Sequence, residues 1–291
     1  MSVFPTYTIH RYTDEIYKVV HFKRSGPSDF VRLPVPREEH GHYDTKLSNS
    51  VSRARSAVLQ YALCNPWEFF FTGTLDRTKF DRYDLDRYQL RLSQFIRDQR
   101  KKWGSQIQYL LVPEMHADGA WHIHGLISGL PDSAITLFPH NAPRKLREGG
   151  FLNWPDYMDK FGFCSLGAVR DPLAVAFYTV GYLDKNISAR AGAVGKHLYF
   201  HSRPLNKACK ASDIYSYHPE LSCLCVNEYE FCSTGMVLDQ SWSFPYVWDG
   251  ADYPIEDLTP LRDPMTGFDP AAVDPTYEQL TISDFARWCN G

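Results

Sequence analysis

The sequence predicts an α+β fold in which a central antiparallel β-sheet carries helices packed on it. Two observations support this class. With 291 residues, 44% of them hydrophobic and 15% aromatic, the chain can bury a large core. Segments typical of strands and helices then follow one another as strand, helix, hairpin, strand, helix and strand, which indicates helices laid on an antiparallel sheet.

The first expected elements are a short strand pair in residues 7–26 and a helix in residues 48–64, joined by a Pro-, Gly- and His-rich loop. Serine and asparagine residues open the helix, and its apolar residues recur at helical spacing. Asn65 and Pro66 then end it.

The centre of the chain is expected to form a strand, a long helix and a hairpin. Residues 67–76 are rich in the aromatic and β-branched residues of a buried strand, and residues 83–104 form a helix that Gly104 stops. Two strands follow at 107–114 and 121–128, separated by a short turn.

Residues 141–162 are expected to be irregular. A second helix follows in residues 171–187, where Asp171 and Pro172 suit the cap and the first helical position. Strands are expected on either side of it, at 163–170 and 197–202.

Three segments are predicted along the chain. Residues 1–59 hold the N-terminal strand pair, the loop and the basic helix, and residues 60–215 hold the main domain. Residues 216–291 form an acidic, Pro-rich segment that we expect to be loosely structured with local helices.

Charge is distributed unevenly along the chain. The net charge is only −3, but two of the 31 Lys and Arg residues lie after residue 220, against 12 of the 34 acidic residues. The preceding part can therefore meet a polyanion, and the final segment would be repelled by one. The alternative is two differently solvated surfaces.

The termini and the cysteines bear on location. The first residues do not have the pattern of a signal peptide, and no stretch is apolar enough for a membrane span, so we expect a soluble protein without a membrane partner. Seven cysteines over a long chain suit reduced thiols in a cytoplasm. Four of them, between Cys209 and Cys232, lack the paired spacing of a zinc module, so buried or free thiols are the favoured alternative to zinc.

The stretch WHIHGLIS contains two histidines that strand geometry places together. Because side chains alternate along a strand, His122 and His124 share one face and Ile123 takes the other. His40 and His42 have the same spacing but lie in a loop, where nothing aims both rings at one point.

Glu114 is the candidate third ligand of a divalent metal ion. If residues 117–119 form a three-residue loop with Gly119 in the left-handed conformation, Glu114 lies opposite His122 on the histidine face. A two-residue turn would put it on the other face. His116 is a substitute ligand or a supporting group, and a hydrogen-bonded polar patch is the alternative to a metal site.

The second predicted helix aligns three polar residues. Tyr178, Tyr182 and Lys185 stand at i, i+4 and i+7 and so share one helical face. Core packing of both tyrosines beside a solvated lysine is the alternative. Next to a metal site, a phenolic oxygen is a competent nucleophile at phosphorus.

These motifs together resemble the HUH endonucleases that initiate rolling-circle replication, over roughly residues 60–205. Glu114, the histidine pair followed by glycine, and Y-x-x-x-Y-x-x-K occur in that family's order. The nearest branch is the two-tyrosine replication proteins of small single-stranded DNA phages and plasmids. The resemblance also implies an RRM-like core, and the strand FTGTL, with Thr72 and Thr74, corresponds to the family's first motif.

The resemblance implies roles for these residues. His122, His124 and Glu114 would hold Mg²⁺ or Mn²⁺ against the scissile phosphate of single-stranded origin DNA. Tyr182 would attack first, leaving a 5′-phosphotyrosine link and a free 3′-OH. Tyr178 would serve the second strand transfer, and Lys185 would bind phosphate.

The same resemblance implies the partners. A host polymerase would extend the 3′-OH in the cytoplasm of a bacterial host, and a host helicase would unwind the duplex. The covalent link conserves the phosphodiester energy, so no nucleotide cofactor is required. RAGAVGKH at 190–197 is not a phosphate loop, because Arg190 replaces the first glycine and no Ser or Thr follows Lys196.

Several residues are candidate DNA contacts. Basic side chains suit phosphates and exposed aromatic rings suit unpaired bases, although a solvated surface role is the alternative for each basic residue. The candidates are Thr72, Thr74, Arg53, Arg55, Arg97, Lys101, Lys102, residues 144–147, Trp121 and Trp154. Two functional alternatives stay open: a transposase or relaxase with the same chemistry, or an origin-binding regulator that does not cut.

Overall fold

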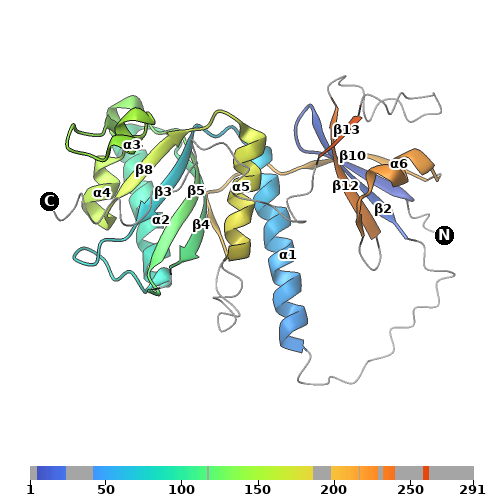
Figure 1. The fold of residues 1–291 in the computed structure, drawn as a ribbon, viewed down its shortest axis with the longest axis horizontal. Coiled ribbons are helices and arrows are strands. Elements are labelled where there is room, and N and C mark those ends of the chain that lie inside the picture. The colour runs from blue at the N-terminus through green and yellow to red at the C-terminus, as the bar shows by residue number, and fades with distance from the viewer. Residues whose placement is uncertain are drawn as a thin grey trace. The chain divides into compact units, whose positions relative to one another are not determined.

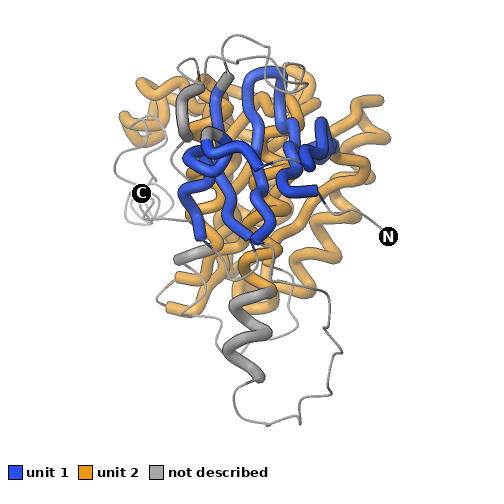
Figure 2. Tube along the Cα trace, turned by 90° about the vertical axis from the view of Figure 1, so that its right-hand side faces the viewer, with its two compact units in different colours: residues 1–45, 206–267 blue, residues 46–205, 268–291 orange. Residues whose placement is uncertain are grey.

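The computed structural model describes residues 5–23, 42–116, 118–185, 198–215, 217–228, 232–239 and 258–261. The chain divides into two compact units (Figure 2). One unit contains residues 46–205, and the other is built from residues 1–45 and 206–267. The helices and strands of each unit are labelled in Figure 1.

The larger unit is an antiparallel sheet with helices on it, so the predicted α+β class is confirmed. Among the described residues its seven strands lie in the order β6-β7-β8-β3-β5-β4-β9. The strands are β3 (Phe69–Thr74), β4 (Gln108–Met115), β5 (Trp121–Ser128), β6 (Thr136–Leu137), β7 (Leu152–Asn153), β8 (Cys164–Ala168) and β9 (Phe200–His201).

Helices α2 (Leu85–Trp103) and α5 (Pro172–Lys185) cover opposite faces of this sheet (Figure 1). Phe71 and Ile123 point into the core formed with α2, whereas Phe70 contacts Tyr178 of α5. Because side chains alternate along a strand, the neighbours of Phe71 and Ile123 belong to the α5 face. The sheet therefore presents its histidines to α5.

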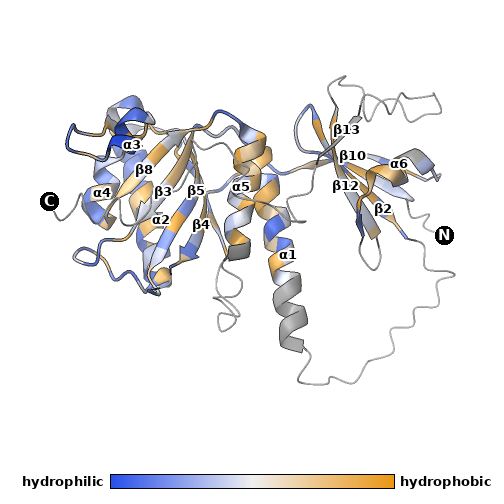
Figure 3. Ribbon diagram, in the orientation of Figure 1, coloured by the Kyte–Doolittle hydropathy of each residue, from blue (hydrophilic) through white to orange (hydrophobic). Residues whose placement is uncertain are grey.

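The predicted signals at the helix ends are confirmed. Asp84 accepts a hydrogen bond from the backbone N–H of Arg87 at the start of α2, and Gly104 ends the helix with a φ of +63°. Asp171 accepts one from the N–H of Ala174 at the start of α5. Figure 3 shows hydrophilic and hydrophobic residues alternating along α2, while α5 is largely hydrophobic, as expected for a helix buried on most sides.

Helix α1 (His42–Leu63) starts earlier than the serine signal predicted. Its end is where the sequence places it, because the side-chain amide of Asn65 donates to the carbonyl of Tyr61. The prediction of an irregular stretch at 141–162 is wrong. It contains α3 (Arg144–Glu148) and α4 (Pro155–Phe161), each shorter than the windows over which helical periodicity is visible. A single 3-10 turn, η1, spans Asp132–Ala134.

The smaller unit is built on a second antiparallel sheet, with six strands among the described residues. Its order is β10-β1-β2-β12-β11, and β13 also pairs with β12. The elements are β1 (Tyr7–Arg11), β2 (Ile16–Phe22), β10 (Cys209–Ile214), α6 (Pro219–Leu224), β11 (Asn227–Glu228), β12 (Cys232–Asp239) and β13 (Leu258–Leu261).

The predicted N-terminal strand pair is confirmed, but it does not stand alone. Strand β1 pairs with β10, and β2 pairs with β12 along its whole length. The expectation of a loosely structured chain after residue 216 is therefore wrong for β12. Partners more than 200 residues away in sequence give this strand its hydrogen bonds, and no local pattern reveals them.

Candidate active site

The β4–β5 hairpin has the register that the sequence predicted. Glu114 lies opposite His122, and the backbone N–H of His116 donates to the carbonyl of Ala120 at 2.9 Å. Gly119 adopts a φ of +81°, the left-handed conformation expected at the end of a three-residue loop. Glu114 therefore shares the face of His122 and His124.

Strand β3 supplies two threonines to the same face. Thr72 lies opposite His124 and Thr74 opposite His122. The Oγ1 to Nδ1 distances are 3.3 Å for the first pair and 3.2 Å for the second. When Nδ1 carries the imidazole proton, the hydroxyl accepts it and Nε2 keeps its lone pair, which is the arrangement of a metal-binding histidine.

Glu114 approaches the second histidine directly. Its Oε2 lies 2.9 Å from Nε2 of His124, and the side chains are 13% and 1% exposed, respectively. Burial lowers the pKa of His122 to about 3, and the charges of His116 and His124 lower it further, so its ring is neutral near pH 7. Neutral imidazoles and a carboxylate are suitable ligands for a divalent ion.

The predicted tyrosines of α5 lie against this group. The ring of Tyr182 stacks on that of His124, with centroids 4.2 Å apart and planes within 8°. Its hydroxyl donates to the hydroxyl of Tyr178 at 2.7 Å. Tertiary structure thus brings together five residues that the sequence predicted separately.

Both tyrosines are buried, with 6% of Tyr178 and 2% of Tyr182 exposed. Burial is the main cause that raises the pKa of each phenol, and the negative charge of Glu114 raises both further. Each hydroxyl is therefore protonated at neutral pH. Any chemistry that needs a phenolate requires a nearby positive charge.

The donors fit a divalent ion in kind, but they do not form a complete site. Across the described residues, no three His, Cys, Asp or Glu side chains stand in the arrangement of a metal centre. This includes the cysteine-rich stretch, where Cys209 and Cys223 are exposed and Cys225 is buried. Binding of Mg²⁺ or Mn²⁺ stays a prediction.

Other predicted residues lie elsewhere or have other neighbours. His116 packs on His122, with ring centroids 3.9 Å apart. Lys185 ends α5, and the role predicted for its side chain falls outside the described residues. Trp121 and Trp154 are buried in the core, so the prediction that they stack on DNA bases is wrong.

The basic candidates do not gather at the histidine face. Arg97, Lys101 and Lys102 lie on exposed positions of α2, which covers the opposite face of the sheet. Lys102 pairs with Asp156 at 2.6 Å. Arg53 is exposed on α1, and contact of any of these residues with DNA stays a prediction.

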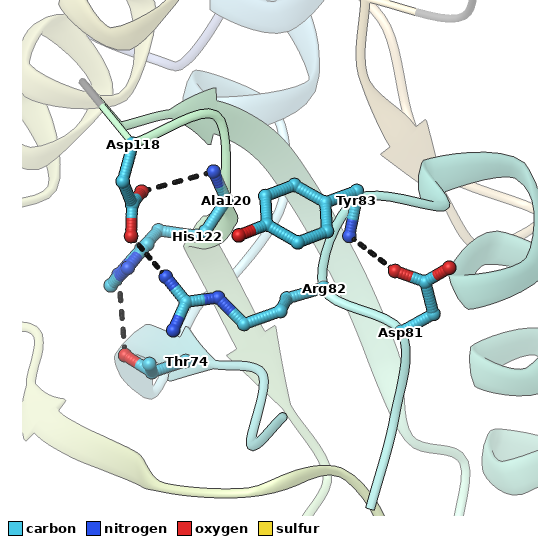
Figure 4. Close-up of polar contacts among 7 residues, drawn as sticks. All are labelled: Thr74, Asp81, Arg82, Tyr83, Asp118, Ala120 and His122. Atoms are coloured by element: carbon cyan, nitrogen blue, oxygen red, sulfur yellow. Dashed lines mark hydrogen bonds and ion pairs between the residues drawn. The ribbon is translucent and has the colours of Figure 1, made fainter. Parts of the chain in front are cut away.

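Sequence reasoning missed Arg82, which lies beside His122 (Figure 4). Its guanidinium pairs with Asp118 at the tip of the hairpin, and its positive charge contributes to the lowered pKa of His122. No local pattern singles out this arginine among its basic neighbours. Only the fold of the β3–α2 connection brings it to the hairpin.

Residues 68–187 match a family model for replication-associated proteins of the ORF2 type. The match supports a replication-associated protein of the rolling-circle type. It spans β3 to the end of α5, and so includes the histidine face and both tyrosines. No curated protein and no solved structure matches the chain. Among the described helices, none is both long and apolar enough to span a bilayer.

Proposed function

We propose that this protein nicks and rejoins single-stranded DNA at a replication origin through a tyrosine nucleophile, as HUH endonucleases of the two-tyrosine branch do. The observation that carries the proposal is the stacking of Tyr182 on His124, next to Glu114. A nucleophile, two imidazoles and a carboxylate then meet at one place, which a purely structural tyrosine pair does not require.

The first step exchanges one phosphodiester for another. Oη of Tyr182 bonds to phosphorus, the P–O3′ bond breaks, and the proton that leaves the phenol ends on the 3′ oxygen. Tyr178 is the first acceptor for that proton, because it already accepts the hydrogen bond of Tyr182. The DNA keeps a 3′-OH for a host polymerase, and no nucleotide cofactor is consumed.

Glu114, His122 and His124 would hold Mg²⁺ or Mn²⁺. A bound ion would polarise the phosphate and favour the phenolate. The threonine hydroxyls keep both imidazoles oriented with Nε2 toward the reacting group. Because both phenols are buried, α5 has to shift from the sheet to admit a phosphate.

The second step reverses the chemistry at the end of a replication round. Tyr178 attacks the next origin copy, and the released 3′-OH attacks the first phosphotyrosine and restores a closed strand. A host helicase would separate the strands ahead of the polymerase. In this scheme Lys185, one turn after Tyr182, would bind phosphate.

The test is a covalent adduct with origin DNA in the presence of Mn²⁺. Strands labelled at the 3′ end should become attached to the protein, whereas strands labelled at the 5′ end should release a free fragment. The Tyr178→Phe/Tyr182→Phe double mutant should form no adduct. Absence of an adduct with the wild type, or an undiminished adduct in the double mutant, rejects the mechanism. DNA binding without an adduct would instead favour a regulator that does not cut.

The chain offers a matched control. Tyr88 and Tyr157 form an equally buried hydroxyl pair, 2.9 Å apart, in the core under α2. A Tyr88→Phe/Tyr157→Phe double mutant removes the same atoms away from the histidine face. It should retain adduct formation, so loss in both double mutants would point to general destabilisation.

A further inference from the structure

Two residues of the β3–α2 connection stand beside the histidine face without a part in the proposed chemistry. Arg82 and Tyr83 are tied to the first residue of β5, since the carbonyl of Arg82 accepts from the backbone N–H of Trp121 at 2.9 Å and that of Tyr83 accepts from its indole at 3.2 Å. The Asp81 carboxylate accepts from the N–H of Tyr83 at 3.0 Å (Figure 4). The pair is therefore held in place before any ligand arrives.

Arg82 is only loosely committed to its partner. Its guanidinium pairs with Asp118, whose side chain is 53% exposed and also accepts from the N–H of Ala120. Nε of Arg82 is buried and makes no hydrogen bond within the described residues. Solvent-exposed ion pairs contribute little to stability, so a phosphate could replace Asp118 at small cost. A guanidinium also matches the geometry of a phosphate better than a lysine does.

Tyr83 is an exposed aromatic residue next to this cation. Its side chain ranks among the exposed large hydrophobic residues, at 60%, and its ring lies against the hairpin tip near Gly119. Cζ of Arg82 lies 5.9 Å from the centroid of the ring. A cation beside an exposed ring is the usual means of holding a phosphate and an unstacked base of a single strand.

We propose that Arg82 and Tyr83 bind the nucleotide next to the scissile phosphate of single-stranded DNA. Arg82 exchanges Asp118 for a backbone phosphate, and Tyr83 stacks on the base. The inference rests on the proposed action on single-stranded DNA, and adds a binding subsite that neither the metal ligands nor the tyrosines supply. Asp118 then acts as a competitor that occupies Arg82 until DNA arrives.

The test is equilibrium binding of the full chain to a fluorescent oligothymidylate in EDTA, at several salt concentrations. Arg82→Gln should weaken binding about tenfold and lower the slope of log K against log salt by about 0.7, the value for one phosphate contact on a single strand. Tyr83→Leu should weaken binding by roughly fivefold or more without changing the slope. Tyr83→Phe should bind like the wild type.

Asp118→Asn separates a ligand role from a structural one. Removing the competing carboxylate should leave binding as tight as in the wild type, or tighten it. If the Arg82–Asp118 pair merely braces the hairpin, Asp118→Asn should instead weaken binding as Arg82→Gln does. Arg87→Gln is the matched control, because Arg87 lies exposed on α2 over the ring of Phe80 and should leave affinity and slope unchanged.

Unchanged affinity in Arg82→Gln and Tyr83→Leu, weakened binding in Asp118→Asn, or no binding of the wild type would overturn the inference. The assay contains no metal and detects no cleavage, so it does not depend on adduct formation. An adduct with the wild type but no effect of Arg82→Gln would refute this subsite alone. The expected binding pattern without any adduct would refute only the nicking chemistry.

Discussion

Replacing Gly125 with alanine should destabilise the larger unit more than any other glycine substitution of comparable backbone strain. Gly125 follows the two histidines in β5 and pairs with Leu111 on one side and Phe71 on the other. A Cβ built there would lie 2.0 Å from the carbonyl oxygen of Leu110 and 2.8 Å from Cα of Leu111. Both neighbours are backbone atoms, which cannot rotate away as a side chain can.

The expected cost has two parts. Overpacking a core costs about 1–3 kcal/mol, and more where backbone has to move. The φ of +152° adds about 1–2 kcal/mol, since an L side chain rarely adopts it. The sum, roughly 2–5 kcal/mol, is a large fraction of the 5–15 kcal/mol that ordinarily keeps a domain folded, about one-third of its midpoint.

Chemical denaturation of the full chain, followed by tryptophan fluorescence, measures this difference. The control is Gly104→Ala at the end of α2, where φ is +63° but nothing lies within 4 Å of the added Cβ. That variant should lose only about 1–2 kcal/mol. If Gly125→Ala is no less stable than Gly104→Ala, the close approach of β4 and β5 is not what excludes a side chain at this position.

Two further predictions concern the histidine face. Thr72→Val and Thr74→Val remove the hydroxyls beside Nδ1 and should slow adduct formation by roughly 10–100-fold at limiting Mn²⁺, with partial recovery as Mn²⁺ is raised; Thr78→Val, an exposed control, should have no effect, and equal rates in all three would reject the orienting role. The pKa of His122 is about 3 in the folded state and 6.5 when unfolded, so its contribution is intact above pH 6.5 and is lost as pH falls toward 3. Between pH 7.5 and 5 this loss should be roughly 2 kcal/mol in the wild type and absent in His122→Asn, measured by denaturation at both values; equal losses in the two proteins would contradict the burial of a neutral ring.

Much of the candidate site follows from local rules. Strand alternation puts His122 and His124 on one face, and a left-handed Gly119 sets the loop length that brings Glu114 opposite His122. Tyr178 and Tyr182 share a helical face because they are four residues apart. Such relations involve residues close in sequence, so turn chemistry and periodicity are enough to predict them.

Contacts between distant segments could not be predicted in this way. No periodicity indicates that α5 covers the histidine face and stacks Tyr182 on His124, or that Arg82 reaches Asp118. These contacts depend on how the apolar faces of separate elements pack, which a single local pattern does not contain.

The sequence by itself determined the α+β class, the hairpin register and the residues of the histidine and tyrosine faces. The tertiary structure decided that these faces meet, and it decided that β1 and β2 complete a sheet with β10 and β12. The physical reason is the same in both cases. Backbone preferences and side-chain spacing act over a few residues, whereas the partner of a buried face is chosen by packing across the whole chain.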